Sequence, residues 1–214
     1  MTVIGALIET RDGKIKNSNL GVLTAATDSG KAQVCAILFD DTAKINVNAL
    51  SQYGATRIVR VSSSAADLNS SPELMAKAVI KAMEEFRISS LLALSSPVGK
   101  DLLNRVAARM KKPVVHDAIG VDWSRKAVMK SHFSGKTIAT VKIDSDRFLC
   151  GIRPNAIEPE QHPCEAEVIS FETGVEGNAG VKIKEIKKSD TGVQDLTEAT
   201  IIISGGRPMA SADN

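Results

Sequence analysis

The stretch that decides the fold is Leu91-Leu-Ala-Leu-Ser-Ser-Pro-Val-Gly-Lys-Asp-Leu-Leu-Asn-Arg-Val-Ala-Ala-Arg-Met110. It opens with a short apolar run and turns at Ser-Ser-Pro-Val-Gly. An apolar stripe at helical spacing follows, made of Leu102, Leu103, Val106, Ala107 and Met110. A buried strand that leads through a tight turn into an amphipathic helix is one unit of a parallel α/β sheet.

The same unit repeats on both sides of this stretch. Apolar runs at residues 3–8, 34–39 and 57–61 predict three earlier strands, and residues 113–115 begin a fifth. Helical patterns lie between them: one is capped by Asn17-Ser18-Asn19 and ends at Gly30, and another begins at Pro72. This alternation predicts a doubly wound, mostly parallel sheet in a three-layer, Rossmann-like α/β fold.

The pattern changes after about residue 118. Strand-like runs at residues 126–130, 137–143, 148–152, 168–171 and 181–186 follow one another without helical periodicity, which predicts an antiparallel extension of the sheet. Residues 191–198 are turn-like, and Ala199-Thr-Ile-Ile-Ile-Ser204 predicts one more strand before Gly205-Gly206-Arg207. A strand this apolar at the end of the chain is expected to be the first of a further domain.

Composition argues against several classes of function. Lys and Arg number 27 against 25 Asp and Glu, so the chain carries only +2, with no basic stripe for nucleic acid. No apolar run is long enough for a membrane span, and we expect no targeting segment at the start of the chain. The three cysteines, Cys35, Cys150 and Cys164, are odd in number and contain no CxxC motif, so we expect neither a disulfide framework nor a zinc site. This use of cysteine indicates a reducing compartment.

Two phosphate motifs are weak. Ser134-Gly135-Lys136-Thr137 matches the end of a phosphate loop, but Lys130 stands where that loop needs glycine and a strand follows instead of a helix, so a hairpin turn is expected. After the first strand stands Glu9-Thr-Arg-Asp-Gly13, without the glycine pattern of a dinucleotide site.

The other candidate site residues can also be explained as ordinary loop residues. Asp40-Asp41 and Lys100 suggest the acidic pocket of a phospho-acceptor domain, but no Asp ends the strand at 57–61. His116-Asp117 with Ser95 and Ser96 could form a hydrolytic triad, yet no nucleophile elbow is present. We interpret His132 and His162 as exposed loop residues.

Specific strings resemble the alpha subunit of electron transfer flavoproteins. Residues 99–108, Gly-Lys-Asp-Leu-Leu-Asn-Arg-Val-Ala-Ala, resemble that family's G-K-D-L-L-P-R-V-A-A, with Asn104 in place of Pro. Phe133-Ser-Gly-Lys-Thr-Ile-Ala-Thr-Val141 is similar to Y-A-G-N-A-L-A-T-V, and Ile152-Arg-Pro-Asn-Ala-Ile157 to V-R-P-x-A-F. Lys188-Ser-Asp190 and the run from Asp195 to Arg207 resemble K-S-D-R-P-x-L-x-x-A-x-x-V-V-S-G-G-R, the most specific of these matches.

The resemblance implies a subunit that carries electrons rather than a catalyst. Such a subunit forms a heterodimer with a beta subunit, accepts electrons from flavin dehydrogenases such as acyl-CoA dehydrogenases, and passes them to a quinone reductase or another acceptor. FAD lies mainly in the second domain of the alpha subunit, AMP is held by the beta subunit, and the first domain is a scaffold for the beta subunit. The compartment would be the cytoplasm of a bacterium or the mitochondrial matrix.

The resemblance also implies site residues and boundaries. Arg207 carries over as an FAD contact, with Gly205 and Gly206 allowing close approach of the backbone. We expect an amino-terminal domain at 1–188, a linker at 189–198 and the start of a truncated FAD-binding domain at 199–214, so that these residues alone do not hold FAD. The alternative hypotheses are a stand-alone adenine-nucleotide-binding regulator and, more distantly, a hydrolase that uses His116.

Overall fold

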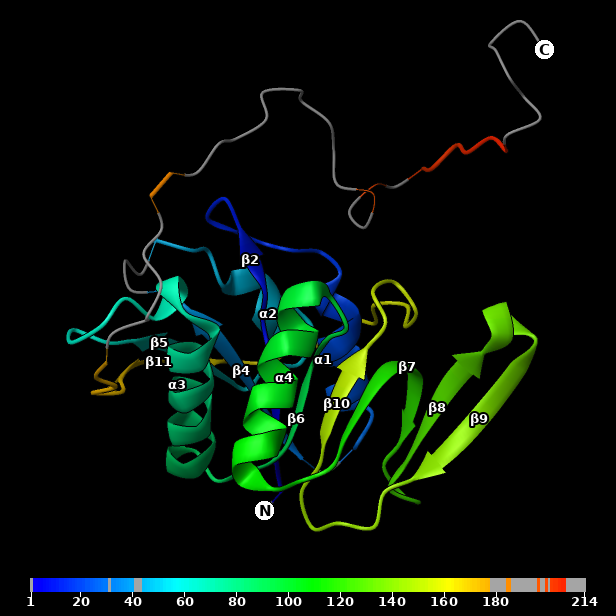
Figure 1. The fold of residues 1–214 in the computed structure, drawn as a ribbon, viewed down its shortest axis with the longest axis horizontal. Helices are drawn as coiled ribbons and strands as arrows, with labels where there is room; N and C mark the ends of the chain where they lie inside the picture. The colour runs from blue at the N-terminus through cyan, green and yellow to red at the C-terminus, as the bar shows by residue number, and fades with distance from the viewer. Residues whose placement is uncertain are drawn as a thin grey trace, which may run out of the picture.

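The computed structural model describes residues 2–30, 32–40 and 44–177, together with 184–185, 196, 199 and 201–206. A nine-stranded sheet runs through the molecule in the order β11-β5-β4-β1-β6-β10-β7-β8-β9 (Figure 1). Its strands are β1 (Val3–Leu7), β4 (Gln33–Phe39), β5 (Arg57–Ser62), β6 (Ile88–Leu94), β7 (Val114–Asp122), β8 (Ala127–His132), β9 (Thr137–Lys142), β10 (Leu149–Ile152) and β11 (Glu167–Glu172).

Helices cover both faces of this sheet and complete three layers. One buried apolar cluster joins α1 and α2 to one face, and a second joins α3 and α4 to the other. The helices are α1 (Asn19–Thr27), α2 (Asn48–Gln52), α3 (Pro72–Glu85) and α4 (Pro97–Met110), with single 3₁₀ turns at η1 (Leu68–Ser70) and η2 (Phe133–Gly135). The predicted doubly wound α/β class is therefore confirmed. Among the described residues, no helix is both long and apolar enough to cross a membrane.

The order of the parallel strands creates a switch point. From β1 the chain moves outward through β4 and β5, then returns to place β6 on the other side of β1. The connections after β1 and β6 therefore leave the sheet in opposite directions, and a crevice opens between the carboxyl ends of these two strands.

The antiparallel extension is confirmed for β7, β8 and β9, but two later strands do not belong to it. β10 lies between β6 and β7 and is parallel to both, and β11 pairs parallel with β5 at the opposite edge. All four residues of β10 are buried, as a central parallel strand covered on both faces requires. Although β10 and β11 follow the antiparallel hairpin in the sequence, they pair in parallel with their neighbours.

The described residues of the segment 199–204 do not form the predicted strand. Residues 201–206 have no regular secondary structure, and Ile201 and Ile203 are 80% and 94% exposed. A strand requires a neighbour to take up its backbone hydrogen bonds, and no described strand pairs with this segment. The predicted strand at 181–186 and the turn-like segment at 191–198 lie largely outside the described residues.

A small hairpin that we did not predict follows β1. Strands β2 (Thr10–Arg11) and β3 (Lys14–Ile15) pair antiparallel around Asp12-Gly13, both of which have positive φ. Asp-Gly is the turn sequence that suits a two-residue hairpin, because both central residues must adopt this conformation. The hairpin turns the chain back toward the crevice between β1 and β6.

Candidate functional site

A crevice lies at the switch point, at the carboxyl edge of the sheet. It encloses about 440 Å³ and is lined by the end of β1, the β2–β3 hairpin and the first turn of α4. Glu9 follows β1 and Ser96 follows β6, so the two residues face each other across the crevice. Ligands of open α/β proteins bind at this position in the fold.

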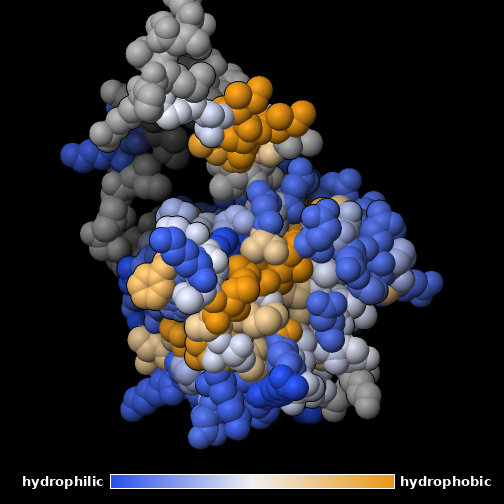
Figure 2. All heavy atoms as spheres, turned by 90° about the vertical axis from the view of Figure 1, so that its right-hand side faces the viewer, coloured by the Kyte–Doolittle hydropathy of each residue, from blue (hydrophilic) through white to orange (hydrophobic). Residues whose placement is uncertain are grey.

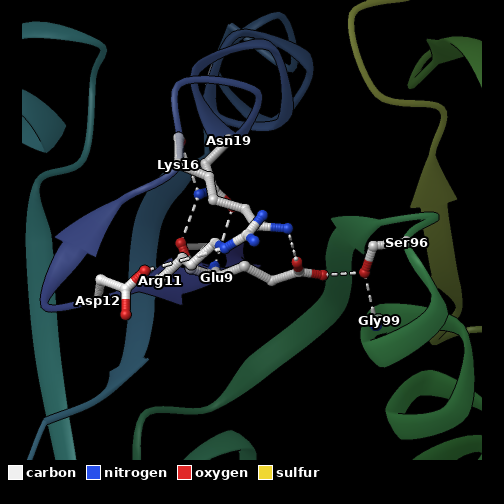
Figure 3. A network of polar contacts seen from close by, with 7 residues as sticks. All are labelled: Glu9, Arg11, Asp12, Lys16, Asn19, Ser96 and Gly99. Atoms are coloured by element: carbon white, nitrogen blue, oxygen red, sulfur yellow. Dashed lines mark hydrogen bonds and ion pairs between the residues drawn. The ribbon is translucent and has the colours of Figure 1, made fainter. Parts of the chain in front are cut away.

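The carboxylate of Glu9 lies at the centre of a polar network beside the crevice (Figure 3). The Ser96 hydroxyl donates a hydrogen bond to Oε1 of Glu9, and Nζ of Lys16 lies 3.1 Å from Oε2. The side chain of Glu9 is only 9% exposed and that of Lys16 19%. Glu9 therefore links the first strand to the start of α4 through contacts that are largely shielded from water.

Asn19 fixes the backbone that carries this carboxylate. Its Oδ1 accepts from the N–H of Glu9 at 3.0 Å, and its Nδ2 donates to the carbonyl oxygens of Glu9 and Lys16, both at 2.8 Å. Asn19 is completely buried. We predicted it only as part of a helix cap, and the side chain of Ser18, at the capping position, makes no capping hydrogen bond.

Ser96, which hydrogen-bonds to Glu9, lies at the amino terminus of α4. Ser96 caps this helix, because its Oγ accepts from the N–H of Gly99 at 2.9 Å. A Cβ at Gly99 would overlap the carbonyl oxygen of Leu94 and would lie 3.1 Å from Oε1 of Glu9. Glycine thus lets the helix start close to β6 and to a carboxylate that the helix dipole favours.

This arrangement makes phosphate binding unfavourable in the crevice. The helix amino terminus and a nearby lysine are the groups that bind phosphates in related folds. Here Lys16 is paired with Glu9, and at the helix terminus the N–H of Gly99 donates to Ser96, so an incoming phosphate would face the negative charge of Glu9 at short range. Glu9, Lys16, Asn19 and Ser96, called the clasp below, thus form a polar network that joins β1, α1 and α4.

Removing the charge of Glu9 is expected to weaken the clasp. Glu9→Gln keeps the shape but leaves the Lys16 ammonium, 19% exposed, without its counter-charge, so we expect a loss of about 1–2 kcal/mol in the free energy of unfolding. Urea denaturation followed by circular dichroism measures it. Lys14→Gln is the control, because Lys14 is an exposed lysine at the start of β3. It should change the free energy of unfolding by less than about 0.5 kcal/mol. Equal stability of the two variants would contradict the assignment.

The residues of the possible hydrolytic triad do not form a relay. Ser95 Oγ accepts from the backbone N–H of Asp117 at 2.8 Å, whereas Nε2 of His116 contacts Oδ1 of Asn104 at 2.9 Å. Asp117 pairs with Lys100, its Oδ1 2.8 Å from Nζ, and Ser96 is used by Glu9. Burial lowers the pKa of His116, and nearby lysines add to this effect against the opposing charge of Asp117.

The acidic-pocket alternative is also not assembled. Asp40, whose side chain is 1% exposed, pairs with Arg60 from the neighbouring strand β5, and Lys100 pairs with Asp117. Asp41 lies outside the described residues. Ser134-Gly135-Lys136 sits at the tip of the β8–β9 hairpin around η2, which confirms the hairpin turn in place of a phosphate loop.

The thiols and histidines offer no reactive centre among the described residues. Cys35 and Cys150 are buried and free, and burial raises the pKa of each thiol to about 12, so they stay protonated and unreactive. Cys164 is also free, and burial raises its pKa. Within the described part of the chain, no cluster of three or more His, Cys, Asp or Glu could hold a metal ion.

The residues predicted to contact FAD are only partly described. Gly205 and Gly206 lie in the exposed segment 201–206, and Arg207 lies outside the described residues. A flavin needs a concave site that buries most of its surface. The exposed glycines do not form such a site with the described residues.

Comparison with known proteins places this geometry in a family. The sequence model of the electron transfer flavoprotein domain matches residues 4–191, which include the nine-stranded sheet except Val3. The chain belongs to the electron transfer flavoprotein family. It is 28% identical over 215 residues to an electron transfer flavoprotein subunit alpha of Thermoanaerobacterium thermosaccharolyticum, covering 96% of this chain and 65% of that subunit.

Other electron transfer flavoprotein alpha subunits match over the same extent. That of Mycobacterium leprae is 28% identical over 97% of this chain and 65% of the relative, and a probable mitochondrial alpha subunit of Caenorhabditis elegans is 24% identical over 96% and 61%. These matches identify the chain with the amino-terminal domain of an alpha subunit. The chain spans about 65% of the length of the first of these relatives.

Proposed function

We propose that this chain is the part of an electron transfer flavoprotein alpha subunit on which the beta subunit assembles. The family match over residues 4–191 carries the proposal. In the complete heterodimer, FAD is the electron carrier and AMP is held by the beta subunit. Electrons arrive from flavin dehydrogenases, such as acyl-CoA dehydrogenases, and leave to a quinone reductase or another acceptor.

The chemistry of the switch point supports a structural role for this domain. The position at which such folds bind nucleotides is held by the carboxylate of Glu9 and its partners Ser96 and Lys16. These contacts join elements that are distant in the sequence and hold β1 to the start of α4. A domain held together in this way suits a base for a partner subunit and for a second, flavin-carrying domain.

The proposal extends to the segment after the described core. Residues 1–188 would form the amino-terminal domain, 189–198 the linker, and 199–214 the first part of the FAD-binding domain. Gly205, Gly206 and Arg207 would then approach FAD once the rest of that domain is present, and this chain would act as part of a carrier, not as a catalyst. Its compartment would be the bacterial cytoplasm or the mitochondrial matrix.

Binding to a beta subunit tests the proposal directly. The 214-residue chain is mixed with the cognate beta subunit and analysed by size-exclusion chromatography with light scattering, alongside an absorbance scan for flavin. We expect a 1:1 complex in which this chain adds no flavin absorbance. A chain that remains monomeric with the beta subunit, or that alone carries a full complement of FAD, would contradict the proposal.

The position of the 440 Å³ crevice favours one alternative, a stand-alone regulator that binds adenine nucleotides. Calorimetric titration with AMP and ATP separates it from the first proposal. Because Glu9 opposes phosphate at this site, we expect no heat of binding from either nucleotide. Micromolar affinity together with no binding to a beta subunit would establish the alternative instead.

A further inference from the structure

The hairpin β8–β9 extends the sheet beyond the layers of helices (Figure 1). It continues β7 in antiparallel pairing, and β9 forms one edge of the nine-stranded sheet. Every second residue of β9, from Ile138 to Lys142, lies on the same face as Met129 and Ser131 of β8, because Ser131 is opposite Ile138 and Met129 is opposite Thr140. On this face Ile138 and Met129 are apolar, and Thr140, Ser131 and Lys142 are polar.

Large apolar side chains are exposed on the hairpin. Ile138 is 65% exposed, Met129 39%, and Phe133 at the tip 79%. Figure 2 looks onto this side of the molecule and shows a continuous apolar strip bordered by hydrophilic residues. A contiguous apolar patch with a polar border is typical of a surface that a partner covers.

The charge on the hairpin has one sign. Between residues 123 and 143 there are five basic residues and no Asp or Glu, although the whole chain carries only +2. The five are Arg125, Lys126, Lys130, Lys136 and Lys142. Among the ion pairs of the described residues, none involves Lys130, Lys136 or Lys142. The exposed ammonium groups of Lys136 and Lys142 are free to meet an acidic surface.

The opposite edge of the sheet differs in ways that protect it. Strand β11 begins with Glu167 and ends with Glu172, and Glu167 pairs with Arg57 of the neighbouring strand. Glu172 accepts hydrogen bonds from the backbone of Ser64 and Gly174. Natural proteins guard an edge strand against pairing by such charges. Strand β9, Thr-Ile-Ala-Thr-Val-Lys, has no acidic residue, no proline and only one terminal charge.

We propose that the partner subunit docks on the hairpin surface, defined here as Met129, Phe133, Lys136, Ile138 and Lys142, and that it presents an apolar patch bordered by Asp and Glu. This inference rests on the proposed function for the existence of that partner. Charge argues against a second copy of this chain as the occupant, because two such surfaces would bring Lys136 and Lys142 of both copies together with no acidic residue on either hairpin. An anionic membrane would need only the charge and would leave the open strand edge unused.

A charge placed in the middle of the surface tests the proposal. Ile138→Asp buries an unpaired carboxylate in the contact, and we expect it to weaken the affinity for the beta subunit by about 100-fold, the size of a central hot spot. Val168→Asp makes the same chemical change on the other edge strand, at a residue that is 50% exposed, and should leave affinity unchanged. Calorimetric titration measures both, and equal melting temperatures show that the variants fold.

A second variant tests the charge separately. Lys142→Glu should slow association with the beta subunit by roughly 10-fold at low salt, and the difference should shrink as salt screens the interaction. Lys14→Glu, an exposed lysine of β3, is the charge-matched control and should bind like the wild type. Stopped-flow fluorescence of Trp123 or of a labelled beta subunit follows the rate.

The failures of the two proposals are distinguishable. If the wild-type chain binds the beta subunit and Ile138→Asp and Lys142→Glu bind equally well, the hairpin surface is not the docking site and the proposed function stands. If the wild-type chain does not bind the beta subunit, both proposals fail. Self-association of the wild type that Ile138→Asp abolishes, or binding to vesicles of anionic lipid that Lys142→Glu abolishes, would overturn the assignment of the occupant.

Discussion

Gly99→Ala is expected to destabilise the protein by roughly 3 kcal/mol, because the added methyl group has no space. Its Cβ would overlap the carbonyl oxygen of Leu94, which is backbone and cannot rotate away. The first turn of α4 would have to move from β6, which would also separate Ser96 from the Glu9 carboxylate. Urea denaturation measures the loss as a lower midpoint at unchanged slope.

Gly13→Ala is the control that distinguishes steric overlap, expected at Gly99, from the strain of a positive φ. Gly13 has φ of +74° in the β2–β3 turn, but a Cβ there would meet nothing within 4 Å. Its substitution should therefore lose only about 1 kcal/mol, from the strained conformation. If the two variants have the same stability, the close approach of α4 to β6 is not a constraint on the fold.

Asp40→Ala is the second change with a large expected effect, a loss of about 3 kcal/mol in the free energy of unfolding. The Asp40 side chain is 1% exposed and that of Arg60 11%, and they form an ion pair between the end of β4 and strand β5. Oδ2 of Asp40 also accepts from the N–H of Ile45 at 3.3 Å, and Arg60 Nη2 donates to the Ile45 carbonyl at 2.9 Å. The substitution leaves a buried guanidinium without its counter-charge.

Asp101→Ala is the matched control for an exposed pair. Asp101 and Arg105 lie one turn apart on α4 and are 45% and 40% exposed, so their separation should change stability by less than about 0.5 kcal/mol. The double variant Asp40→Ala with Arg60→Met should recover part of the loss, because the orphaned charge is removed as well. A single Asp40→Ala variant as stable as the control would show that the buried pair contributes little.

The layers of the fold could be predicted from local pattern. A βα unit is recognised where a short, wholly apolar run is followed by apolar residues at helical spacing. Residues 91–94 and the apolar stripe of α4 show this change of pattern. The direction of pairing of β10 could not be predicted in this way. Leu149–Ile152 is short and wholly apolar, and such a run does not reveal whether its neighbours are parallel.

The clasp at the switch point was missed for a similar reason. Glu9, Lys16 and Asn19 are polar residues in a loop, and only the tertiary structure brings Glu9 to Ser96, 87 residues later. One signal was present, since Asp12-Gly13 predicts a hairpin that returns Lys16 to Glu9. The identity of the family, in contrast, was predicted correctly from contiguous strings, which need no tertiary information.

The crevice and the hairpin give a consistent picture of the domain. Glu9 pairs with Lys16 and accepts a hydrogen bond from Ser96, which caps α4, so the usual ligand edge serves stability. The apolar and basic hairpin at the end of the sheet is then the surface left for assembly. On this view the domain contributes a docking platform to an electron carrier, and the redox chemistry belongs to the flavin and the protein around it.

Hydrogen–deuterium exchange with and without the beta subunit tests this central claim most directly. We expect slower exchange in the complex over residues 127–142, where backbone groups of β8 and β9 become covered, and unchanged exchange over the crevice at residues 9–16. Protection of the crevice with no change in the hairpin would contradict the claim.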